Sequence, residues 1–81
     1  MKFESDKKVD AKGLKCPQPL MLAKKAFHDM ETGQVILLEA TDPHTDLDLE
    51  VWCERFGHVI QLSLEEDNIF YFIIQKGNTN G

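Results

Sequence analysis

The chain has 81 residues with a formal net charge of −5, and 42% of its residues are hydrophobic. This length and apolar content favour one small globular domain over residues 1–81, with a core over about residues 8–76 and flexible ends, rather than a disordered chain. No apolar run is long enough for a secretory signal or a membrane span, so we expect a cytoplasmic protein that does not bind a membrane. The acidic net charge disfavours direct binding of nucleic acid.

The first strand is predicted over residues 8–11, and a Gly13-Leu14-Lys15-Cys16-Pro17-Gln18-Pro19 junction follows it. A helix is predicted from Pro17 to Glu31, because apolar residues recur at helical spacing up to Met30. Gly33 is predicted to stop this helix. The cysteine therefore lies where a strand gives way to a helix.

Cys16 is predicted to be the N-cap residue of this helix, because a residue before proline is pushed out of the α region. Pro17 and Pro19 fall in the first turn, where a missing N–H costs little, and the Gln18 N–H is expected to face the sulfur. Since a helix N-terminus favours an anion, we expect a lowered pKa and a moderately activated thiol at Cys16, with Lys15 adding to the effect. The alternative is a small capping residue with an inert sulfur.

A strongly apolar strand is predicted over residues 34–40, central in the sheet, and Asp42-Pro43 ends it. The second helix is predicted from Thr45 to Phe56, with Gly57 as its stop. Thr45 and Asp48 resemble a weak capping box, and the apolar stripe of this helix includes Cys53.

Two further strands are predicted over residues 60–64 and 69–75, joined as an antiparallel hairpin. Ile60, Leu62 and Leu64 alternate with polar residues and should share one face. Residues 76–81 are expected to form a frayed tail.

The order βαβαββ predicts an α/β two-layer sandwich, with two helices packed on one face of a four-stranded mixed sheet. Functional sites in such folds gather where strands end and helices begin. The turns over residues 11–20 and 41–47 should lie together at that end if their strands are parallel.

The charges are distributed unevenly along the chain. Residues 1–25 hold seven lysines against three acidic residues, a net charge of +4, whereas residues 26–81 hold two basic and eleven acidic residues, a net charge of −9. One interpretation is a solvated acidic surface. The other is a basic patch beside Cys16, formed by Lys24, Lys25 and His28, that binds an acidic protein partner.

The remaining polar candidates have structural and functional interpretations. Asp42 either ends the strand or lines the rim of the Cys16 site, and His44 is either a solvated loop residue or a proton acceptor for Cys16. Cys53 is expected to be a buried packing residue. The histidines and cysteines lack metal-ligand spacing, so neither a metal nor another cofactor is expected.

Taken together, these blocks resemble the TusA/SirA family of sulfur-carrier proteins over roughly residues 10–77. The resemblance rests on Asp10, Gly13-Leu14, Cys16-Pro17-Gln18-Pro19, Asp42-Pro43, Asp48, Cys53, Gly57-His58 and Lys76-Gly77. It implies that Cys16 accepts sulfur as a persulfide from a cysteine desulfurase and passes it to a downstream sulfur-relay protein similar to TusBCD, for 2-thiouridine in tRNA. Such a protein is a carrier that performs half-reactions, not an enzyme in the usual sense.

Three other interpretations stay open at this point. The acidic stretch Asp46-Leu47-Asp48-Leu49-Glu50 departs from the TusA-like pattern. A carrier of a sister branch, which transfers sulfur or selenium in another route, is therefore one alternative. A thiol redox module would oxidise Cys16 and resolve it with Cys53, provided that the two sulfurs come within disulfide range. A regulatory interaction module would use no covalent chemistry.

Overall fold

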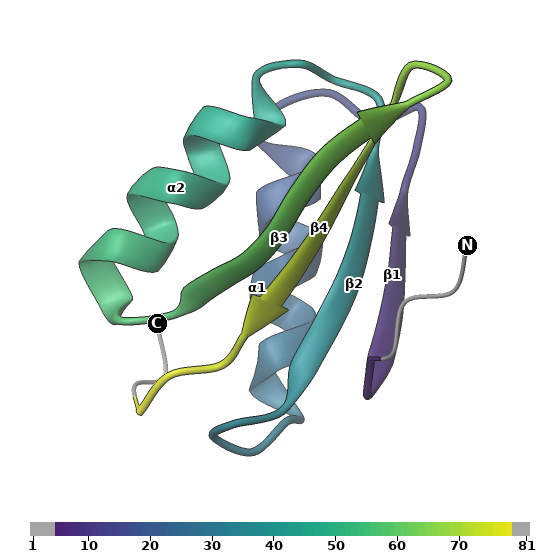
Figure 1. The fold of residues 1–81 in the computed structure, drawn as a ribbon. Helices are drawn as coiled ribbons and strands as arrows, with labels where there is room; N and C mark the ends of the chain where they lie inside the picture. The colour runs from purple at the N-terminus through teal and green to yellow at the C-terminus, as the bar shows by residue number, and fades with distance from the viewer. Residues whose placement is uncertain (1–4, 79–81) are drawn as a thin grey trace.

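The computed structural model describes residues 5–78, which form strands and helices in the predicted order (Figure 1). Their bounds are β1 (Lys7–Ala11), α1 (Gln18–His28), β2 (Val35–Ala40), α2 (Thr45–Phe56), β3 (Val59–Glu66) and β4 (Ile69–Gln75). Among these described residues, no helix has the length and apolar character needed to cross a membrane.

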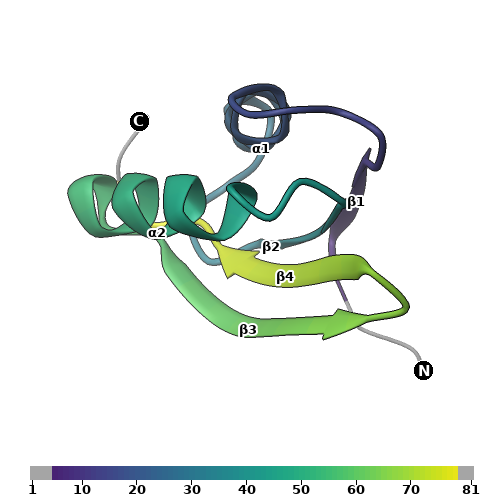
Figure 2. The ribbon, with the colours of Figure 1, turned by 90° about the horizontal axis from the view of Figure 1, so that it is seen from above.

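The strands form a mixed sheet in the order β1-β2-β4-β3. The β1–β2 pair is parallel, whereas β4 is antiparallel to both β2 and β3. Both helices pack on the same face of this sheet, which Figure 2 shows from above. The predicted two-layer sandwich with β2 inside the sheet is therefore confirmed.

The core lies between the helices and the covered face of the sheet. Alternate residues of β2 and β4 point toward the helices, because successive side chains of a strand face opposite sides. The buried cluster includes Ile36, Leu38 and Ala40 from β2, Phe72 and Ile74 from β4, Ala23, Ala26 and Phe27 from α1, and Leu49, Trp52 and Cys53 from α2. This packing holds both helices against the same face of the sheet.

Helix α1 is shorter than the predicted Pro17–Glu31 range. It ends at His28 with Asp29 as its C-cap residue, and the Met30 N–H donates to the Phe27 carbonyl at 3.1 Å. The Lys76 ammonium donates to the Phe27 carbonyl at 2.5 Å and to the Met30 carbonyl. A lysine from beyond β4 thus adds side-chain donors to carbonyls at the end of the helix, where intrahelical donors run out.

The predicted frayed tail is wrong for its first residues. Lys76 is buried, and its backbone bonds to Gly33 and Gln34 continue the pairing beyond β4. The Gly77 N–H donates to Nδ1 of His58 at 2.8 Å. A Cβ on Gly77 would lie 2.2 Å from the Gly57 carbonyl oxygen, so this close approach requires glycine. The other part of the prediction concerns residues 79–81, which lie outside the described residues.

Strand β3 contains a β-bulge that the alternation pattern does not reveal. Ile60 pairs with Ile74, but Leu62 pairs with Ile73, so Gln61 is an extra residue on β3. Because successive positions of β4 face opposite sides, Ile60 lies on the helix side and Leu62 on the open side. The prediction that Ile60, Leu62 and Leu64 share a face is therefore wrong for Ile60.

Helix α2 has the predicted bounds and ends at Gly57, whose φ of 77° is left-handed. The predicted capping box is absent. His44 is the N-cap residue, there is no side-chain cap hydrogen bond, and the Asp48 side chain bonds elsewhere.

Candidate functional site

The turn after β1 and the turn after β2 lie together at one edge of the sheet. The carboxyl ends of parallel neighbouring strands meet at the same edge, and each of these strands leads into a helix there. The Gly13 N–H donates to Oγ1 of Thr41 at 2.9 Å, and the Cys16 N–H donates to Oδ2 of Asp42 at 2.6 Å. The predicted approach of these two turns is confirmed.

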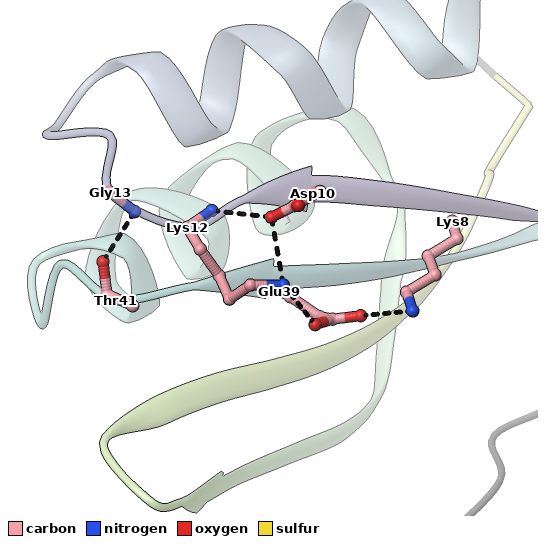
Figure 3. Close-up of polar contacts among 6 residues, drawn as sticks. All are labelled: Lys8, Asp10, Lys12, Gly13, Glu39 and Thr41. Carbon is pink, nitrogen blue, oxygen red and sulfur yellow. Dashed lines mark hydrogen bonds and ion pairs between the residues drawn. The ribbon is translucent and has the colours of Figure 1, made fainter.

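A buried carboxylate secures the first turn (Figure 3). The Glu39 side chain, only 8% exposed, pairs with the ammonium groups of Lys8 at 3.0 Å and Lys12 at 2.9 Å. The Lys12 ammonium group also lies 3.3 Å from the Asp10 carboxylate. The same carboxylate accepts a hydrogen bond from the Lys12 backbone N–H at 3.0 Å. The hydrogen bonds from Lys12 and Lys8 hold the pKa of Glu39 below its ordinary value, although burial opposes them.

Sequence reasoning missed this ion-pair network, although one signal for it was present. Glu39 is a charged residue inside an otherwise apolar strand, and a buried carboxylate needs a partner. The parallel register places Asp10 of β1 beside Glu39, so Lys8 and Lys12 flank the carboxylate. The network ties the end of β1 to β2 just before the cysteine-bearing turn.

Cys16 is exposed, but it is not the N-cap residue. Pro17 occupies that position, and the Gln18 N–H donates to the Lys15 carbonyl at 2.8 Å rather than to the sulfur. The Cys16 thiol instead donates a hydrogen bond to Oδ2 of Asp48, from α2. The predicted sulfur contact with the first helical N–H is therefore wrong, because the turn itself uses that N–H.

The electrostatic surroundings of Cys16 are opposite to those predicted. The hydrogen bond to Asp48 raises the pKa of the Cys16 thiol, and desolvation and the negative charges of Asp48 and Asp42 act in the same direction. The expectation of a lowered pKa is wrong for this reason. These contacts favour the neutral thiol over the thiolate at the exposed Cys16 side chain.

Asp42 both follows the end of β2 and lines the cysteine site. Its carboxylate accepts the N–H groups of Cys16 and His44, the latter at 2.9 Å, and contacts the His44 ring at 3.0 Å. These hydrogen bonds hold the pKa of Asp42 below its ordinary value. The His44 side chain is 79% exposed and contacts Asp42 rather than the Cys16 sulfur. The structure thus favours the solvated-loop interpretation of His44.

A cavity of about 400 Å³ opens beside this cysteine, between the two turns. Its lining comes from both turns: Gly13, Leu14, Lys15, Thr41, Asp42, Pro43 and His44. Asp42, which accepts the Cys16 N–H, belongs to this wall. Cys16 therefore adjoins the recess through its backbone, next to the lining residue Lys15, whereas its sulfur contacts Asp48, which is not part of the lining.

The other residues predicted for the site have two different placements. Pro17 and Gln18 are exposed beside Cys16, whereas Pro19 is buried under the first turn of α1. Lys24, Lys25 and His28 are exposed further along α1 and make no described contact with Cys16 or Asp42. They form a separate surface of the helix.

Cys53 is buried in the core, as predicted, with an exposed fraction of 4%. Burial raises the pKa of its thiol to about 11, so it is a poor nucleophile at neutral pH. Since Cys16 is exposed and Cys53 is enclosed by core residues, this arrangement does not favour a redox pair.

The chain matches known proteins over most of its length. Residues 7–76 match the family model described as sulfurtransferase TusA. The chain is 43% identical to YrkI of Bacillus subtilis over 93% of its own length and 100% of the relative. It is 39% identical to the sulfur carrier protein TusA of Allochromatium vinosum, over 88% and 93% of the two chains. It is also similar to the crystal structure of a SirA-like protein from Desulfitobacterium hafniense, with a TM-score of 0.78 and 28% sequence identity. That match covers 89% of this chain and 99% of the SirA-like chain.

Proposed function

Because this chain belongs to the TusA family of sulfur carriers, we propose that Cys16 accepts sulfur as a persulfide from a cysteine desulfurase and passes it to the thiol of a downstream relay protein similar to TusBCD. The endpoint that we propose is 2-thiouridine in tRNA, without direct contact between this protein and the nucleic acid. The relay would operate in the cytoplasm, where free thiols persist.

The observation that carries this proposal is the exposure of Cys16 in the turn before α1, which also contributes Gly13, Leu14 and Lys15 to the neighbouring recess. A carrier needs one thiol that a donor and an acceptor protein can both reach, and the second cysteine of this chain is buried. Pro17, Gln18, Pro19, Lys15 and Asp42 would support the site by shaping the turn and its rim.

Sulfur transfer to Cys16 is a thiol exchange. The Cys16 sulfur attacks the outer sulfur of the donor persulfide and forms the new S–S bond. The donor S–S bond breaks, its electron pair stays on the donor cysteine, and that sulfur takes up a proton equivalent to the one that Cys16 releases. No external oxidant is consumed, and no metal or organic cofactor is needed for this step.

Intact-mass spectrometry tests the loading step. The protein is incubated with a cysteine desulfurase and free cysteine, and we expect a gain of one sulfur atom that a reducing agent removes. Cys16→Ser should abolish the gain, whereas Cys53→Ala, the matched control, should keep it. Failure of every desulfurase from the same cell to load the protein would overturn the proposal.

The endpoint is tested separately in cells. Deletion of the gene should lower the 2-thiouridine content of tRNA, and wild-type protein, but not Cys16→Ser, should restore it. Unchanged 2-thiouridine together with Cys16 loading would assign the carrier to another sulfur or selenium route.

A further inference from the structure

The contact between Cys16 and Asp48 joins two elements at the proposed transfer site. Asp48 lies in the first turn of α2, is 32 residues from Cys16 in sequence, and accepts the hydrogen bond of the thiol. Among residues 5–78, no lysine, arginine or histidine forms an ion pair with Asp48. Its negative charge is therefore directed at the sulfur without a neutralising partner in the described part of the chain.

The other charged groups around the sulfur can be identified by element. Asp42, from the turn after β2, adds a second negative charge, and His44 contacts the Asp42 carboxylate rather than Cys16. Lys15 is the cation on the cysteine-bearing turn itself, and its side chain is exposed. Acidic groups from two neighbouring segments thus face the thiol.

A carboxylate in contact with a sulfur atom has opposite effects on its neutral and anionic forms. It accepts a hydrogen bond from a neutral thiol and stabilises that form, but it repels a thiolate. It also repels a persulfide anion held on the same cysteine. The raised pKa of the Cys16 thiol agrees with this argument.

We propose that Asp48 is a positioning residue that keeps Cys16 as a neutral, oriented thiol in the free carrier and weakens the retention of sulfur on Cys16, so that the sulfur passes on to the next thiol. This inference rests on the proposed carrier function and deepens it. It assigns to Asp48 control over how readily the site loads and how readily it unloads.

The protonation arm of the test uses Asp48→Asn, which removes the charge at nearly constant size. Alkylation of Cys16 by iodoacetamide, followed by peptide mass spectrometry over a range of pH, measures the fraction of thiolate. We expect the midpoint of the profile to move to lower pH and the rate at neutral pH to rise about tenfold, because a neighbouring negative charge is gone. Asp46→Asn, in the same turn but without a contact to Cys16, is the matched control and should keep the wild-type profile.

The loading arm uses glutathione persulfide in a glutathione buffer as the sulfur donor. The exchange converts the Cys16 thiol and glutathione persulfide into the Cys16 persulfide and glutathione, with all atoms and electrons conserved. At neutral pH we expect Asp48→Asn to hold several-fold more persulfide at equilibrium than wild type, and to release it more slowly to added glutathione. Asp46→Asn should again behave as wild type.

These outcomes separate the two proposals. If wild type loads on Cys16 but Asp48→Asn alkylates and loads as wild type does, the inference about Asp48 is overturned and the carrier function stands. If neither protein loads from glutathione persulfide or from a desulfurase, the carrier function is overturned. Asp48→Ser removes the same charge and replaces Asp48→Asn if that variant fails to fold, as judged by the circular dichroism spectrum.

Discussion

At the scale of single residues, the Asp48 carboxylate, rather than the start of α1, sets the electrostatics of the Cys16 sulfur. Free N–H groups at a helix start act as roughly half a positive charge, whereas the Asp48 carboxylate carries a full negative charge and contacts the sulfur. Because Coulomb energy scales with charge and falls with distance, the carboxylate outweighs the helix start. The thiol pKa is accordingly raised, and a strand-to-helix junction alone does not identify an activated cysteine.

The first prediction concerns Glu39, whose pKa is held down in the folded state by Lys12 and Lys8. A carboxylate with a depressed pKa contributes stability that is present above its unfolded pKa, near ~4.3, and is lost as the pH falls through its lower folded pKa. We expect Glu39→Gln to lower the free energy of unfolding by about 1 kcal/mol at neutral pH, since both lysines are partly exposed to screening solvent. Urea unfolding from neutral to acidic pH measures this difference.

Acidification provides the internal control for this prediction. The difference between wild type and Glu39→Gln should close once Glu39 itself is protonated, because both side chains are then neutral. Glu54→Gln, at an exposed position of α2, should have little effect at any pH. A difference for Glu39→Gln that is the same at every pH would contradict the ion-pair explanation.

At the scale of elements, the end of α1 depends on a residue outside the helix. The buried Lys76 ammonium donates to the Phe27 and Met30 carbonyls. We expect Lys76→Met to lower the free energy of unfolding by about 1–3 kcal/mol, because it removes the ammonium donor of the Met30 carbonyl and leaves the Phe27 carbonyl with a backbone N–H alone. Amide exchange at the last turn of α1 should accelerate as well. Lys24→Met, on the exposed face of the same helix, is the control, and an equal loss in both variants would refute the capping role.

A second prediction at this scale follows from the β-bulge in β3. Ile60 packs against the buried core cluster, whereas Leu62 lies on the open face of the sheet. We expect Ile60→Ala to cost about 2–3 kcal/mol of unfolding free energy and Leu62→Ala about 1 kcal/mol, because only the first leaves a cavity in the core. Urea unfolding of the two variants measures this ranking. Equal costs would indicate regular alternation without a bulge.

At the scale of the whole molecule, the uneven charge distribution bears on partner binding. Lys24, Lys25 and His28 are exposed on α1, in the basic part of the chain, and we propose that they bind the cysteine desulfurase. Charge reversal at Lys24 and Lys25 together should raise the Kd for the desulfurase about tenfold, and added salt should weaken wild-type binding. Titration by fluorescence anisotropy measures both effects. Lys7→Glu, on β1, is the control, and binding that is indifferent to salt would exclude a basic docking patch.

The sequence by itself determined the order of elements, the sandwich, the core role of Cys53 and the resemblance to sulfur carriers. The first three follow from local spacing, namely apolar periodicity and glycine and proline stops, whereas the resemblance rests on the cysteine–proline turn and the motif blocks that follow it. Cys16 and Asp42 were also identifiable, since both stand in turns where strands end.

Only the tertiary structure decided what the Cys16 sulfur contacts, how α1 ends and which way Ile60 faces. The Cys16–Asp48 and Lys76–Phe27 contacts join residues 32 and 49 positions apart, and the bulge is defined by pairing between strands. The physical reason is range: periodicity and capping signals act over a few residues, whereas the charge beside a thiol depends on which distant helix packs there. In this protein that helix is α2, and its Asp48 raises the pKa of Cys16, where the sequence predicted a lowered value.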